Sequence, residues 1–321
     1  MSTPDANLSS AAEVVPPVSA ETQRALLQTL TVLIRREFWE HRALWIAPAV
    51  VSALLVLSAF PLHIGGVSFG ADPGLAHTQA RENIFALMIW GQSVPQYLIM
   101  SIVVTFYLLD CLYAERKDRS ILFWKSLPVS DATTVLSKLL VGLVVVPFGV
   151  YVLAMVSGIL FQIIWAVRMA AGFVPPVSVS WDTLVWLKVQ GLMLYALLIA
   201  ILWYSPLAAF LLLVSAWARK NVVLWATLPP LLLVIAERWT FGTRYFALLL
   251  KYRTWGLWDA LLVPAMTAEG LDHPHVVSLS DLFDNITMAK AFLNIDLWLG
   301  VAVAAAFVFA ATRIRRYRDD T

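Results

Sequence analysis

The chain has 321 residues, of which 60% are hydrophobic and only 14% are charged. A soluble globular domain carries about 25% charged residues, so this composition excludes an ordinary soluble domain. The net charge of +2 is too small to indicate nucleic-acid binding. The single cysteine, Cys111, excludes a disulfide framework or a cysteine metal cluster within the chain. The sequence therefore predicts an all-α, polytopic membrane protein.

The N-terminal part of the chain predicts a tail and a surface helix. Residues 1–21 are rich in Ser, Ala and Pro and lack an apolar period, so we expect a disordered tail. The first 40 residues are polar and lack the short apolar core and small-residue cleavage site of a signal peptide, so we expect the transmembrane segments to direct insertion. Within residues 22–42, Leu27, Leu30 and Ile34 recur at helical spacing, which predicts an amphipathic helix along the membrane surface. A simple juxtamembrane anchor and a specific partner contact are both open interpretations of this helix.

Six apolar stretches predict the transmembrane domain. Crossing a bilayer takes roughly 20 predominantly apolar residues. The stretches that meet or nearly meet this length are 44–62, 84–109, 139–167, 184–218, 222–236 and 295–312. The long fourth stretch contains Pro206 and the short fifth contains Pro229 and Pro230, which are tolerated where neighbouring helices satisfy the freed backbone groups. Residues 43–321 therefore predict one packed six-helix domain.

The basic residues predict the orientation. With six spans, fifteen of the 23 lysines and arginines lie on the side of both termini and eight on the other. Because positive charge accumulates in cytoplasmic loops, we expect both termini to be cytoplasmic in a bacterial inner membrane. The outer loop 237–294 is apolar and contains Trp239, Trp255 and Trp258, which predicts re-entrant or interfacial helices, or else a small packed cap.

The sequence lacks the common catalytic signatures. It contains no GxxxxGK[ST], HExxH or GxSxG motif, and its five histidines lack helical metal spacing. We therefore expect no enzyme activity, no cofactor and no metal in this chain.

The predicted cytoplasmic loop 111–138 carries the most specific signal. Its first half alternates in charge sign, and its middle is the apolar run ILFW. Asp118 or Ser120 could cap a short helix there, which Pro128 would end. Such a helix would present an apolar surface, surrounded by charged side chains, to a soluble partner. A solvated positive-inside loop is the simpler alternative, but it does not explain an exposed Trp124.

This loop resembles the signature between the second and third spans of ABC-2 type transporter permeases. The family has an acidic-basic start, a nearby acid, a Gly-Thr or similar pair, an apolar stretch, Leu-x-x-Pro-Val-Ser and a lysine at the next helix. Lys117 stands where the family has a second acid, and Arg119 where it often has glycine. The residues that match are Glu115, Arg116, Asp118, Ser120, Leu127, Pro128, Val129, Ser130 and Lys138.

The resemblance implies a permease subunit of an ATP-binding cassette transporter, with export as the expected direction. Two permeases, identical or different, would pair with two separate ATPase subunits that hold ATP and Mg, and the other contacts would be with membrane lipid. Residues 22–42 would be an interface helix, with Arg35, Arg36 and Glu37 at the partner. The implied coupling residues are Glu115, Arg116, Lys117, Asp118, Arg119, Ser120, Phe123, Trp124, Leu127 and Pro128.

Two other functions are weighed against this one. The first is a membrane-embedded enzyme acting on lipid or lipid-linked sugar; its candidate residues are scattered without metal spacing and comprise Asp259, Asp272, His273, Asp281 and Asp284. The second is a non-transporting scaffold or sensor subunit. The transported substrate is not indicated by the sequence.

Overall fold

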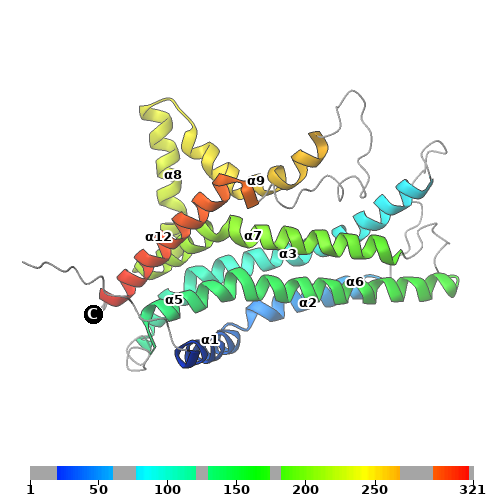
Figure 1. Ribbon diagram of the computed structural model, residues 1–321, viewed down its shortest axis with the longest axis horizontal. Helices are drawn as coiled ribbons and strands as arrows, with labels where there is room; N and C mark the ends of the chain where they lie inside the picture. Colours follow the sequence, from blue (N-terminus) through cyan, green and yellow to red (C-terminus); the bar gives the residue numbers. More distant parts are fainter. Residues whose placement is uncertain (1–19, 61–76, 121–128, 174–181, 268–291, 318–321) are drawn as a thin grey trace, which may run out of the picture.

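The computed structural model describes residues 20–60, 77–120, 129–173, 182–267 and 292–317, and these residues are almost entirely helical. Figure 1 shows long helices side by side along the long axis, with a shorter group packed above them. The elements are α1 (Ala20–Glu40), α2 (Ala43–Leu57), α3 (His77–Lys117), α5 (Asp131–Leu140), the π-helical turn η1 (Val141–Val145), α6 (Val146–Ala170), α7 (Thr183–Trp217), α8 (Val222–Thr240), α9 (Tyr245–Thr267) and α12 (Ile295–Tyr317).

The prediction of a polytopic helical protein is confirmed at this coarse level. Within the described residues, five helices are long and apolar enough to cross a membrane. A sixth span is possible if residues 28–40 of α1 and helix α2, which meet at a bend of 62°, count as one broken span. Helix α2 covers Ala43–Leu57 of the first predicted stretch, 44–62, and the end of that stretch lies outside the described residues.

Several helices continue beyond the predicted apolar stretches. Helix α3 has 41 residues and runs through Lys117, and α5 begins at Asp131, so the connection between them is much shorter than the predicted 111–138. The helical run from Asp131 to Ala170 is interrupted only by the π turn. Pro147 lies two residues after the last residue of that turn, and because proline lacks the N–H of a regular α-helix, a widened turn can accommodate it.

The ends of the helices carry local signals. Asp182 begins α7, since its carboxylate accepts hydrogen bonds from the backbone N–H groups of Leu184 and Val185 at 2.8 and 3.1 Å. Ser130 begins α5 by accepting from Thr133 N–H at 3.1 Å. Helix α3 ends before Arg119, whose φ of 56° is the left-handed conformation that glycine adopts most easily.

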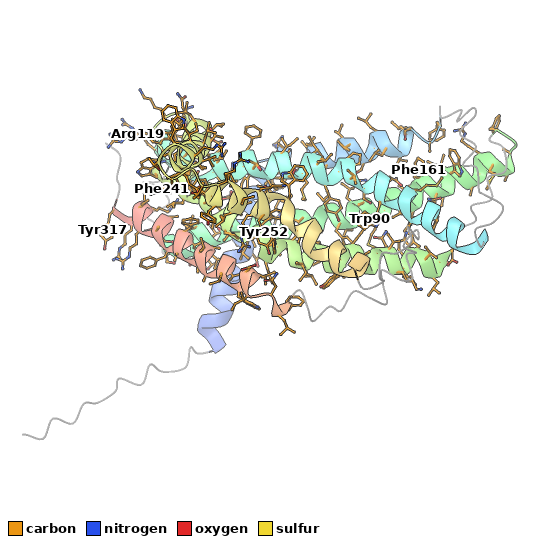
Figure 2. All side chains as sticks on the ribbon, turned by 90° about the horizontal axis from the view of Figure 1, so that it is seen from above. Trp90, Arg119, Phe161, Phe241, Tyr252 and Tyr317 are labelled. Atoms are coloured by element: carbon orange, nitrogen blue, oxygen red, sulfur yellow. The ribbon has the colours of Figure 1, made fainter. Side chains whose placement is uncertain are left out.

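The core joins α3, α5, α7 and α12. Leu108, Val135, Leu212 and Ala311 are among its fully buried residues, and small side chains such as Ala208 and Ala216 let α7 pack closely against its neighbours. The outside of the helices is apolar as well, as Figure 2 shows, with exposed residues that include Val156, Ile163, Leu231, Leu249 and Val303. An apolar exterior over an apolar core is typical of a protein surrounded by lipid.

Helix α1 lies across one end of the bundle, where the C-terminal part of α12 also ends (Figure 1). We call this the basic end, because the last turn of α3 carries Arg116 and Lys117 and the last turn of α12 carries Arg315 and Arg316. Helices α8 and α9 form a hairpin on the side of the long helices away from α1 (Figure 1). The predicted outer loop 237–294 is therefore largely helical, as far as Thr267; residues 268–291 lie outside the described part of the chain.

Candidate functional site

Charged side chains from four helices meet inside the protein at the basic end. We define the basic-end cluster as Arg36, Glu37, Glu115, Asp131, Lys138 and Arg315. Lys138 is 0% exposed, Glu37 1%, Arg315 4% and Glu115 5%. Removing an isolated ion from water costs several kcal/mol, so the burial of these groups depends on the oppositely charged groups beside them.

Lys138 is the centre of the cluster. Its Nζ lies 2.8 Å from Glu37 Oε1 and 3.1 Å from Glu115 Oε1. The Tyr107 hydroxyl donates to the other oxygen of Glu37 at 3.0 Å. One ammonium group thereby joins α1 and α3 to α5. Lys138 lies in the last turn of α5, before the π turn begins at Val141.

Arg315 forms the second branch of the cluster. Its Nη1 donates to Glu115 Oε2 at 2.5 Å, and its Nε donates to Asp131 Oδ1 at 3.0 Å. The planar guanidinium presents several donors in a fixed geometry, so it can hold two carboxylates from different helices. Arg315 lies in the last turn of α12, where a positive charge is also favoured by the helix dipole.

The end of α1 supplies a third branch. Arg36 Nε lies 2.7 Å from Glu40 one turn on, and Arg36 Nη2 lies 3.5 Å from Glu115. His41 Nδ1 is 3.7 Å from Glu37 Oε2, and its ring meets the Tyr107 ring edge-on at a centroid distance of 4.9 Å. Helix α1 is therefore fixed to the bundle by ion pairs as well as by apolar packing.

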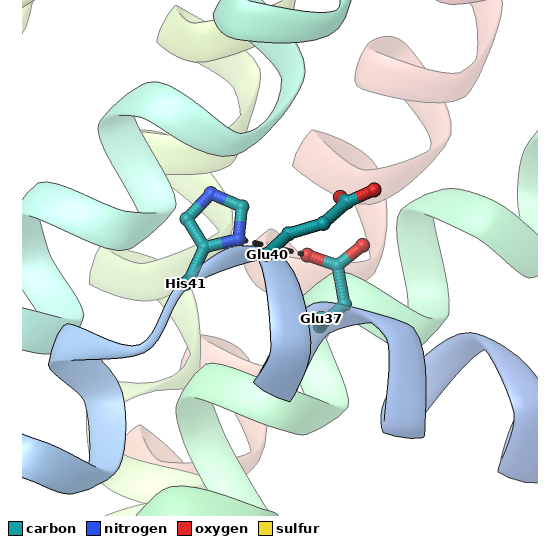
Figure 3. Close-up of side chains that lie close together, drawn as sticks. All are labelled: Glu37, Glu40 and His41. Carbon is teal, nitrogen blue, oxygen red and sulfur yellow. Dashed lines mark ion pairs between the residues drawn. The ribbon is translucent and has the colours of Figure 1, made fainter.

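Glu37, Glu40 and His41 are the one group of potential metal ligands in the described residues, and Figure 3 shows them on consecutive turns. Lys138 and Tyr107 already occupy the two oxygens of Glu37, and Arg36 is paired with Glu40. A metal ion would have to displace these partners, so the arrangement favours an ion-pair network over a metal site.

Arg116 is also directed inward. Its Nη2 donates to the backbone carbonyls of Ser215 and Ala218, both at 2.7 Å, at the C-terminal end of α7. Unpaired carbonyls and the negative end of the helix dipole make this a favourable place for a cation. Of the predicted coupling residues, Glu115 and Arg116 thus make contacts within the chain, and their predicted contact with an ATPase stays a prediction.

The remaining predicted coupling residues divide into two groups. Lys117, Asp118 and Arg119 are exposed at the end of α3, and Ser120 Oγ donates to the carbonyl of Glu115 at 3.3 Å. The apolar part of the motif lies outside the described residues and comprises Phe123, Trp124, Leu127 and Pro128. On the predicted interface helix, Arg35 is exposed, whereas Arg36 and Glu37 belong to the basic-end cluster.

The predictions missed Asp131, Arg315 and Tyr107 as members of the site. For Glu37, by contrast, the sequence carries a signal of burial. It follows Leu30, Leu33 and Ile34 at helical spacing, which places an acid on the apolar face of the helix. No comparable local pattern marks Arg315, because its partners are far away in the sequence.

The basic end is not the only polar region. Between α3 and α6, Gln96 is 0% exposed and donates to Ser157 Oγ at 2.9 Å, while Gln92 donates to the Ser157 carbonyl at 3.1 Å. Near the start of α12, the Arg253 guanidinium lies over the Trp203 ring and donates to the carbonyl of Asp296. Both regions hold helices together by polar contacts within an apolar surrounding.

The candidate residues of the alternative enzyme are not brought together by the described structure. Asp259 lies in α9, and the other four lie in residues 268–291, outside the described residues. Comparisons of the chain with protein-family models, with curated proteins and with solved structures find no match. The ABC-2 resemblance accordingly depends on the residues of the motif.

Proposed function

We propose that this chain is the membrane-embedded permease subunit of an ATP-binding cassette exporter of the ABC-2 type, driven by a separate ATPase subunit. The observation that carries the proposal is the Lys138 ammonium, which ties the surface helix α1 to both ends of the motif-bearing segment through Glu37 and Glu115. The two elements that would contact an ATPase thereby form one unit.

A feature of the backbone at Arg119 supports the resemblance. The family often has glycine at this position, and Arg119 has a positive φ of 56°. A non-glycine residue in this conformation costs about 1 kcal/mol, so the chain keeps the turn even without the residue that favours it. A positive φ is the conformation that glycine adopts most easily, so it supports the proposed alignment of Arg119 with the family's glycine.

The proposed orientation places the basic end in the cytoplasm. The basic end carries the arginines and lysines at the ends of α3 and α12, and cytoplasmic segments of membrane proteins have an excess of positive charge. The exposed Lys117 and Arg119 and the segment that follows would then face the ATPase.

The cluster also provides a physical route for coupling. Breaking one buried ion pair leaves an uncompensated charge, which costs about 3–5 kcal/mol. A displacement of the docked segment would therefore move α1, α3, α5 and α12 together rather than separate them. ATP binding and hydrolysis in the partner would bias two arrangements of this unit, which is how an interface couples two sites.

The test is purification of the tagged full-length chain from its native membranes in mild detergent. We expect a Walker-motif ATPase to co-purify in equal amount, and ATP hydrolysis in the complex that the separated permease lacks. Substituting the exposed pair Lys117 and Arg119 with glutamate should weaken the complex, whereas the same change at the exposed Arg244 in the α8–α9 turn should not.

Three outcomes would count against the proposal. A chain that purifies from native membranes without any ATPase, in detergents that preserve other transporters, cannot be driven as proposed. Turnover of a lipid substrate by the isolated chain would favour the enzyme alternative. A stable complex with a membrane or soluble partner that lacks a nucleotide site would instead favour the scaffold or sensor.

A further inference from the structure

Arg315 contacts two residues of the motif-bearing segment, one on each side of residues 116–130. Glu115 lies in the last turn of α3, and Asp131 is the first residue of α5. The chain between them is the segment that resembles the coupling element. Arg315 donates to both carboxylates, through Nη1 to Glu115 and through Nε to Asp131, from a helix about 200 residues away in sequence from Glu115.

We infer that Arg315 is a positioning residue that holds the end of α3 (the α3 root) and the start of α5 (the α5 root) in a fixed relation, and that partner binding by the chain between them depends on this fixation. This inference rests on the proposed function for the identity of the partner. The fixation itself is a property of the chain alone.

The geometry favours an arginine over a lysine. The two carboxylates come from different helices, and the guanidinium reaches them with separate nitrogens on one rigid plane. A lysine would offer a single charged atom on a flexible stem, so it can contact two carboxylates only where both approach the same point, as Glu37 and Glu115 do at Lys138. Lys138 already supplies such a single-point contact to Glu115, at 3.1 Å, whereas the ion-pair partner of Asp131 among the described residues is Arg315.

The two roots differ in how many partners hold them. Glu115 also contacts Lys138 and Arg36, so the α3 root has three cations. Asp131 is 25% exposed at its side chain and has Arg315 as its ion-pair partner in the described residues. Loss of Arg315 should therefore loosen the α5 root more than the α3 root.

Hydrogen–deuterium exchange of the detergent-solubilised chain tests the fixation without any partner. Losing a hydrogen bond to a charged group costs about 1.5–3 kcal/mol, so Arg315→Ala should speed exchange of the α5 amides of residues 134–137 on the order of tenfold or more. Exchange at the end of α3 should rise less. Asp131→Asn should reproduce the α5 effect and leave α3 unchanged, and Arg315→Lys should restore it only in part.

Arg316 provides the matched control, because it is the neighbouring arginine on the same turn and is exposed. Arg316→Ala should leave exchange at both roots within about twofold of the wild type. If Arg315→Ala is too unstable to purify, Arg315→Lys and Asp131→Asn still test the inference. Equal exchange in the Arg315, Asp131 and Arg316 variants would overturn it.

Binding of the co-purifying ATPase then tests the positioning role. Arg315→Lys should weaken association on the order of tenfold while leaving the KM for ATP unchanged, since the nucleotide site is in the partner. Faster exchange in Arg315→Lys together with unaltered association would show that Arg315 holds both roots but that partner binding does not depend on it. This result would overturn the inference. Absence of any ATPase from the wild-type preparation would instead reject the proposed function and leave the exchange result standing.

Discussion

Replacing Lys138 with methionine should destabilise the protein strongly, because it removes the one cation that contacts both Glu37 and Glu115. Lys138 is 0% exposed and lies 2.8 Å from Glu37 and 3.1 Å from Glu115. Methionine fills a similar volume, so the loss is mainly electrostatic. Breaking a buried pair in this way costs about 3–5 kcal/mol.

The contacts that remain after the substitution indicate which carboxylate contributes most of this free-energy cost. Glu115 keeps Arg315 and Arg36, whereas Glu37 keeps only a hydroxyl from Tyr107 and the His41 ring within 4 Å among the described residues. The penalty should therefore come mostly from Glu37. Glu37→Gln in the Lys138→Met background removes that stranded charge and should recover about 2 kcal/mol, a coupling in the range measured for contacting residues.

Cys111 gives a built-in assay for these variants. It is the single cysteine of the chain and is 1% exposed in the core beside the cluster, so a thiol-reactive fluorogenic dye reports its exposure on heating in detergent. We expect the midpoint for Lys138→Met to fall on the order of 10 °C. Lys117→Met at an exposed position should change it by little, since such surface substitutions are worth about 0.5 kcal/mol or less. Equal midpoints for the two lysine variants would refute the reasoning.

Three further substitutions probe other parts of the bundle by the same assay. Ser157→Ala should cost about 1–3 kcal/mol because it strands the buried Gln96 amide, whereas Gln96→Leu with Ser157→Ala should be closer to neutral; the reverse order would contradict this account. Asp182→Ala should cost about 1 kcal/mol and speed amide exchange in the first turn of α7, and unaltered exchange there would argue against its capping role. Trp203→Ala should cost about 3–5 kcal/mol, since the 1% exposed indole also lies under Arg253; a loss below 1 kcal/mol would mean that α9 does not depend on this contact.

The predicted helix boundaries agree best with the structure where they depend on interactions between residues close in sequence. The fourth apolar stretch, 184–218, corresponds within one residue at each end to α7, because its length and apolar composition are properties of that stretch and the cap, Asp182, lies two residues before it. The second stretch, 84–109, was placed correctly but was too short. Its helix continues through Glu115 and Lys117, since charges that seem to end an apolar run can be paired inside the protein.

The site was predicted only in part. The motif pointed to Glu115 and Lys138, but it indicated a charged rim facing outward, whereas Glu115 is 5% exposed and contacts Lys138, Arg36 and Arg315. Whether the exposed Lys117 and Arg119 contact an ATPase stays a prediction.

The sequence by itself determined the class of protein, because the hydrophobic composition and the length of each apolar run are properties of the chain that only a membrane can accommodate as helices. Only the tertiary structure decided which charges are buried together. Arg315 has no local feature that distinguishes it from Arg316, yet one is 4% exposed between two carboxylates and the other is exposed. The difference arises because Coulomb interactions depend on distance in space, and helix packing brings Glu115 and Arg315 together across 200 positions of sequence.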